Sequence, residues 1–128
     1  MCVKKRIKYI LISVMVFIGI FLLFRTVFFI GVVPTASMEP TLKENSVVFG
    51  MRIFSEPQVG DIVVFERDGS LLVKRVAAAE GDEVMWRGEV LTVPDDCYYL
   101  LGDNPEHSYD SRFWDEPFIH ASNIIAVI

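Results

Sequence analysis

Apolar residues follow two different patterns along the chain. Residues 7–30 form an almost continuous apolar run, interrupted by single polar or small residues such as Lys8, Ser13 and Arg25. As an α-helix, a run of this length crosses the ~30 Å hydrocarbon core of a bilayer. The sequence therefore predicts a transmembrane helix over residues 7–30, behind a tail of residues 1–6.

After residue 30 the apolar runs become short, and turn-forming residues separate them. Strands are expected at 46–49, 62–65, 71–77, 84–86, 89–93, 97–101 and 124–128. Arg87-Gly88, between two of these strands, predicts a hairpin. Strand-forming residues with turn signals every ~8–12 positions are typical of an all-β domain. We expect a mainly β protein: one N-terminal transmembrane helix, then a small all-β domain over residues 31–128.

Charge predicts how this helix is oriented. The run is preceded by Lys4, Lys5 and Arg6, whereas all 17 acidic residues follow residue 30. Positively charged flanks remain in the cytoplasm. We therefore expect a single-pass protein of the plasma membrane, with a cytoplasmic N-terminus and an extracytoplasmic β domain. The lipid bilayer is one expected partner, and the acidic outer domain argues against nucleic acid.

Two details of the membrane segment affect this picture. A cleaved signal sequence remains an alternative to a retained anchor, but its apolar region is usually only ~7–15 residues and ends at a small-x-small site. Cys2 and Cys97 are expected on opposite sides of the bilayer, so they cannot pair within one chain. Cys97 is interpreted as a packed or free thiol.

Candidate chemistry begins just past the apolar run, at Ser37. A serine hydroxyl becomes a good nucleophile when a neighbouring base takes its proton, and lysine is a recurring base in such pairs. A lysine can do so when burial lowers its pKa. In the strand expected at 71–77, alternation places Lys74 on one face with Leu72 and Val76. The alternative is a solvated lysine on a strand edge.

Four sequence boxes in order strengthen the Ser37–Lys74 pairing. The chain resembles the type I (leader) signal peptidases of bacteria, which are membrane-anchored Ser-Lys proteases. The matching segments are residues 34–42, 60–65, 74–76 with 80–82, and 102–112. The segment between Lys74 and Gly102 is shorter than in larger relatives, which insert a β subdomain there. Residues 105–107 and Asp115 also depart from the usual pattern.

The resemblance implies roles for individual residues. Ser37 would be the nucleophile and Lys74 its general base. The backbone N–H of Ser37 and the hydroxyl of Thr35 would form the oxyanion hole. The supporting residues would be Ser108, which orients the lysine, the ion pair of Asp110 with Arg112, and the structural anchor Asp103.

Each supporting residue also has a simpler interpretation. Asp103 fits an ordinary turn, and Asp110 with Arg112 fits a surface ion pair of little energetic value. His107 and His120 are interpreted as bystanders, because the base position of the family holds Lys74 in this chain.

The resemblance also implies a substrate and a reaction. The protein would remove signal peptides from secreted precursors, binding the substrate as an added extended strand near Val33, Leu72 and Val73. No metal or cofactor is expected. A pilus-assembly accessory of the same fold, acting as a binding or chaperone-like module, is the alternative. A self-cleaving repressor-type protease is disfavoured, because it would need a DNA-binding domain and no membrane span.

Overall fold

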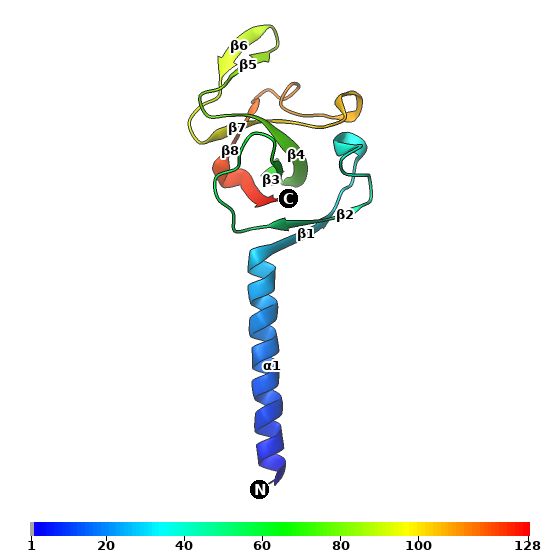
Figure 1. The fold of residues 1–128 in the computed structure, drawn as a ribbon, viewed down its shortest axis with the longest axis vertical. Helices are drawn as coiled ribbons and strands as arrows, with labels where there is room; N and C mark the ends of the chain where they lie inside the picture. Colours follow the sequence, from blue (N-terminus) through cyan, green and yellow to red (C-terminus); the bar gives the residue numbers. More distant parts are fainter. Residues whose placement is uncertain (1) are drawn as a thin grey trace.

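A single long helix precedes the β domain. The structure, a computed structural model, describes residues 2–128, and the side chain of Cys2 lies outside that description. Helix α1 (Cys2–Val27) projects from one end of the β domain, and the β5–β6 hairpin lies at the opposite end (Figure 1). Residues 3–27 of this helix are apolar and long enough to cross a membrane, and none of its most apolar window is buried against the protein.

The helix differs from the expected residues 7–30 at both ends. It begins at Cys2, and residues 28–30 belong to strand β1 (Phe28–Val32) instead. Strand pairing explains the early end, because Phe28 lies opposite Met51 and Ile30 opposite Phe49 on β2 (Val47–Met51). Phe29, on the other face of β1, is buried in the domain.

Arg52 fixes the junction between helix and strand. Its backbone N–H donates to the Val27 carbonyl at 2.7 Å, and its Nε donates to the Phe28 carbonyl at 3.2 Å. The guanidinium also lies 5.4 Å from the centre of the Phe29 ring. These contacts satisfy carbonyls at the end of the helix that have no partner within it.

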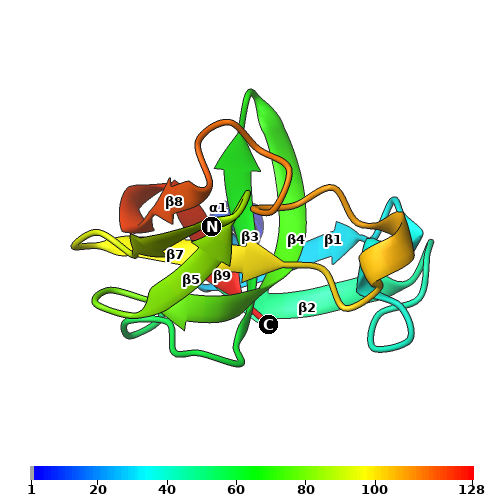
Figure 2. The ribbon, with the colours of Figure 1, turned by 90° about the horizontal axis from the view of Figure 1, so that it is seen from above.

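A seven-stranded antiparallel sheet forms most of the β domain, in the order β1-β2-β9-β3-β4-β7-β8. The remaining strands of this sheet are β3 (Ile62–Arg67), β4 (Ser70–Ala79), β7 (Cys97–Leu101), β8 (Phe118–His120) and β9 (Ile124–Val127). Viewed from the end opposite the helix, β3 and β4 lie between β1–β2 on one side and β7–β8 on the other (Figure 2). β4 is therefore central, and its side chains reach both faces of the domain.

A separate two-stranded sheet, β5 (Glu83–Trp86) and β6 (Glu89–Thr92), forms the expected hairpin. Its turn residues Arg87 and Gly88 both have positive φ, 47° and 87°. Two consecutive positive φ values are those of the type I′ turn, whose twist suits a tight hairpin. The mainly β fold is confirmed, but β1 and β8 were not expected from the sequence.

Packing is apolar on both faces of the central strands. On β3, Val63 and Phe65 belong to a cluster with Leu100 and Trp114, whereas Val64 packs with Phe29, Val48 and Ala126 on the other face. β3 is thus buried on both sides, which explains its continuous apolar sequence. The neighbouring β4 is buried on one face, which carries Lys74, Val76 and Ala78.

Candidate active site

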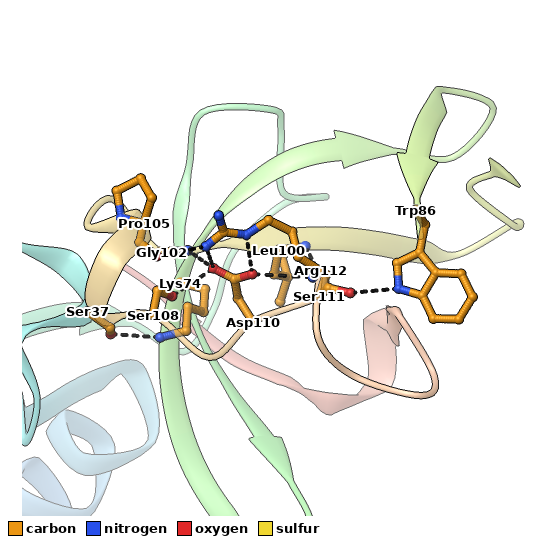
Figure 3. A network of polar contacts seen from close by, with 10 residues as sticks. All are labelled: Ser37, Lys74, Trp86, Leu100, Gly102, Pro105, Ser108, Asp110, Ser111 and Arg112. Carbon is orange, nitrogen blue, oxygen red and sulfur yellow. Dashed lines mark hydrogen bonds and ion pairs between the residues drawn. The ribbon is translucent and has the colours of Figure 1, made fainter. Parts of the chain in front are cut away.

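Ser37 and Lys74 meet in the folded domain. Ser37 lies on a single turn of 3-10 helix, η1 (Ala36–Met38), and Lys74 lies in the middle of β4. Lys74 Nζ donates a hydrogen bond to Ser37 Oγ at 2.7 Å (Figure 3). Both residues are buried, with exposed fractions of 5% for Ser37 and 4% for Lys74. The alternative of a solvated lysine is therefore wrong.

The surroundings of Lys74 favour its neutral form. Burial lowers the pKa of Lys74 below its ordinary value, and the negative charge of Asp110 partly opposes this by raising it. Burial disfavours an ammonium because it loses hydration. Lys74 is thus suited to accept a proton from Ser37.

Thr35 lies beside Ser37. Its hydroxyl donates to Ser37 Oγ at 3.2 Å from an extended, exposed position immediately before η1. A hydroxyl in this place is near the atoms where negative charge develops during acyl transfer.

Two residues to which the sequence assigned no role contact the backbone of η1, the turn that carries Ser37. Asn104 donates from its backbone N–H to the Ser37 carbonyl at 2.9 Å and from its side-chain amide to the Ala36 carbonyl at 3.0 Å. A Cβ atom at Gly102 would overlap Ser108 Oγ and lie 2.6 Å from the Ser37 carbonyl oxygen. Glycine is required there because the Ser108 side chain and the Ser37 carbonyl both converge on it.

Asp110 is the centre of a buried hydrogen-bond network (Figure 3). Its carboxylate accepts from Arg112 at 2.8 and 2.9 Å, from Ser108 Oγ at 2.7 Å and from the Gly102 N–H at 3.0 Å. Burial alone would raise the pKa of Asp110, but these hydrogen bonds, that of Arg112 first, lower it below its ordinary value. Because Asp110 is 0% exposed, its ion pair with Arg112 is not a surface pair.

Ser108 belongs to this network, but its hydrogen bond differs from the expected one. The hydroxyl donates to Asp110 rather than to Lys74. Its role in orienting the lysine thus stays a prediction, and its observed contact connects it to the carboxylate that acts electrostatically on Lys74.

Asp103 lies on the other side of β4, with Arg75. Arg75 donates to both oxygens of Asp103, at 2.8 and 2.7 Å, and to the Gly60 carbonyl at 2.7 Å. Thr41, just after η1, also donates to Asp103 at 2.6 Å. The hydrogen bond from Arg75, above all, lowers the pKa of Asp103. Asp103 is thus more than a turn residue, since it joins β4 to the segment that carries Ser37.

The expected substrate-binding residues line a cavity at the dyad. Val33, Leu72 and Val73 surround it together with Ser37 and Lys74, and its volume is about 40 Å³. His107 and His120 are both exposed, and His120 Nδ1 accepts from the Ser122 N–H. Over residues 2–128, no group of three His, Cys, Asp or Glu residues is arranged to hold a metal ion.

Comparison with known proteins agrees with this geometry. A "Probable signal peptidase I-2" of Synechocystis sp. is 33% identical over 116 residues, covering 64% of this chain and 53% of that protein. The signal peptidase I of Bacillus amyloliquefaciens is 28% identical over 117 residues, covering 63% of each. Subunit 1 of the mitochondrial inner membrane protease of Mus musculus is 34% identical over 95 residues, covering 61% of this chain and 54% of that protein.

The chain spans about half the length of the curated cyanobacterial relative that it matches, 53%. The family model described as "Signal peptidase, peptidase S26" matches in two overlapping segments, residues 6–93 and 86–128. Together these segments include Ser37, Lys74 and the Asp110 network. The chain belongs to the signal peptidase family, peptidase S26.

Proposed function

We propose that this protein is a membrane-bound serine endopeptidase that removes signal peptides from precursor proteins through a Ser37–Lys74 dyad. The observation that carries the proposal is the 2.7 Å hydrogen bond between two buried side chains, Lys74 and Ser37. A buried lysine without a direct carboxylate partner is an unusual structural element, but it is what a general base requires.

In the first step, neutral Lys74 accepts the Ser37 proton while Oγ attacks the carbonyl carbon of the scissile bond. The hydroxyl of Thr35 and the backbone N–H of Ser37 stabilise the oxyanion. The tetrahedral intermediate then breaks its C–N bond, and the Lys74 ammonium gives its proton to the leaving amine. Water, deprotonated by Lys74, hydrolyses the Ser37 ester, and the proton returns to Ser37 Oγ.

The cavity next to the dyad limits the side chain that precedes the cut. Its volume of about 40 Å³ is close to the ~30 Å³ that one water molecule occupies in the liquid. Such a space favours a small side chain over a large aromatic one. This agrees with the small-x-small sites that end signal peptides.

Helix α1 supports the proposed localisation. The basic residues Lys4, Lys5 and Arg6 precede its apolar part, which favours a cytoplasmic N-terminus and an extracytoplasmic catalytic domain at the plasma membrane. Residues 1–6 would be the cytoplasmic tail, and residues after the helix the peptidase domain. The pilus-assembly alternative has no support from the relatives named above.

Cleavage of a signal-peptide-bearing precursor by the full chain in detergent tests the proposal. Ser37→Ala and Lys74→Ala should each abolish cleavage, while the matched controls Ser122→Ala and Lys43→Ala, at exposed positions, should cleave like wild type. Wild-type rates in both dyad variants would refute the proposed chemistry. A pilus-type binding module would instead keep its cellular role in Ser37→Ala.

A further inference from the structure

The tip of the β5–β6 hairpin touches the segment that carries Asp110. Trp86 Nε1 donates to the Ser111 carbonyl at 3.1 Å (Figure 3). Arg87 Nη2 donates to the Phe113 carbonyl at 2.9 Å and pairs with Asp115 at 3.2 Å. The Arg87 guanidinium also stacks over the Trp86 ring, 4.5 Å from its centre. Two adjacent side chains thus hold the backbone of residues 111–115.

Apolar packing also attaches the hairpin to the domain. Val93 is 1% exposed and packs with Ala78 and Tyr99, while Val84 and Trp86 pack against the same cluster. This cluster also contacts Leu101, which immediately precedes Gly102. The hairpin is therefore a rigid arm from which Trp86 and Arg87 project, and not a free loop.

The segment that they hold connects directly to the dyad. Ser111 is 0% exposed; its N–H donates to the Leu100 carbonyl at 3.1 Å, and its Oγ accepts from the Leu100 N–H at 2.9 Å. The preceding residue, Asp110, binds Ser108 and the Gly102 N–H. From the indole of Trp86, fixed contacts thus continue through Ser111 and Asp110 to the groups around Lys74.

We propose that Trp86 and Arg87 are positioning residues for catalysis, which keep the 108–112 segment closed over Lys74. This inference rests on the proposed Ser37–Lys74 mechanism. No residue of the hairpin lines the cavity at Ser37, Val33 and Leu72. Its influence must therefore act on the base, and not on substrate binding.

The charged groups around Lys74 set the direction of the effect. From the 108–112 segment it faces Asp110, which Arg112 neutralises. The Arg75–Asp103 pair lies on the opposite side of β4, and η1 contributes no charged side chain. Burial is the larger influence on Lys74, so opening the segment to water should raise the pKa of Lys74 toward its ordinary value.

The test uses Trp86→Phe, which keeps a packed ring but removes the N–H, and Arg87→Met, which keeps an aliphatic stem. Arg67→Met is the matched control, because Arg67 also stacks on a tryptophan, Trp114 at 4.3 Å, and donates to a backbone carbonyl, that of Glu116. Arg67 holds residues 114 and 116, further along the chain than the Ser111 carbonyl that Trp86 binds. Steady-state cleavage, pH–rate profiles and thermal melting are measured on each full chain in detergent.

The double variant Trp86→Phe/Arg87→Met should lower kcat by about 10–10²-fold with KM changed less than about twofold, since misplacement of a catalytic group by ~1 Å has an effect of this size. The ascending limb of its pH profile should move to higher pH. Arg87→Lys keeps a side-chain hydrogen-bond donor, so its kcat should be higher than that of Arg87→Met. Arg67→Met should leave both the limb and kcat per folded molecule unchanged.

An unmoved pH limb in the hairpin variants, or an equal movement in Arg67→Met, would overturn the inference. If the double variant does not fold, the single Trp86→Phe variant decides by the same criterion. Full activity in Lys74→Ala would instead refute the proposed mechanism itself, so the two failures are distinguishable.

Discussion

The two faces of strand β4 use a cation in opposite ways. Arg75 is partly exposed and makes a bidentate pair with Asp103, which raises the pKa of Arg75 through that hydrogen bond. Lys74, its neighbour, is buried, contacts a hydroxyl and has a lowered pKa. One face stabilises a positive charge, and the other destabilises one, as the proposed proton transfer to Lys74 requires. Alternation along a single strand separates these two environments.

The largest expected effect comes from replacing Lys74 by arginine, the residue type found on the other face of β4. Lys74→Arg should be as inactive as Lys74→Ala, a loss of about 10³-fold or more, because a guanidinium keeps its proton. Lys74→His should retain a trace of activity. Precursor cleavage by the three variants measures this. Substantial activity in Lys74→Arg would mean that Lys74 only positions Ser37.

Wild-type activity should rise with pH as the Lys74 ammonium loses its proton, with an apparent pKa below the ~10.4 of a solvated lysine. A pH profile of kcat/KM for the full chain in detergent provides the measurement. If activity rises only near that ordinary value, burial does not lower the pKa of Lys74 enough for it to act as the base.

Gly102→Ala should have the next largest effect, because the added methyl overlaps Ser108 and crowds the Ser37 carbonyl. We expect a loss of about 10²-fold in kcat, since a shift of ~1 Å in a catalytic group has that cost. Gly69→Ala, at the β3–β4 turn with open space around it and positive φ, is the control for introducing alanine. It should lower stability while sparing kcat per folded molecule.

On the structural face, Asp103→Asn should lower stability by about 1.5–3 kcal/mol, the usual scale for a hydrogen bond to a charged group, with a smaller effect on cleavage. The pKa of Asp103 is lowered by folding, so its stabilisation is present above the unfolded pKa of ~3.9 and is lost as pH falls through the folded value. Thermal melts of wild type and Asp103→Asn should therefore converge in acid. Curves that stay equally far apart would contradict this assignment.

The smallest effect should be a gain. Lys74→Met replaces a poorly hydrated amine by an apolar side chain of similar length, and should raise stability at neutral pH by about 1 kcal/mol, or ~4 °C in Tm. The unfolded lysine binds more protons than the folded one, so wild-type stability rises with pH up to ~10.5 and the gain shrinks accordingly. Arg75→Met should do the opposite and destabilise.

Much of this arrangement could be predicted from the sequence. Period-2 alternation placed Lys74 with Leu72 and Val76, and short apolar runs predicted most strands of the sheet. Strand β1 could not be separated from the helix, because Phe28 and Ile30 are as apolar as the residues before them, and only pairing with β2 makes them a strand. Strand β8 is a three-residue strand, too short to show a period.

The supporting contacts were harder to predict than the dyad. Asn104 and Trp86 act through backbone carbonyls, whose positions depend on the whole fold and have no sequence signature of their own. Ser108 was expected at Lys74, but the hydroxyl of a serine two residues from a buried carboxylate reaches that carboxylate first. Residue types therefore predicted the Ser37–Lys74 pair, while tertiary packing decided which neighbours hold it.

For the proposed peptidase activity, the direct junction between α1 and β1 would influence which bond of a precursor is cut. The helix ends at Val27, the strand begins at Phe28, and Arg52 binds the carbonyl of each, so no flexible tether separates them. If the helix spans the membrane, this junction sets the distance between the lipid surface and Ser37. A precursor would be selected by the distance between its apolar segment and its cleavage site, as well as by the side chains at that site.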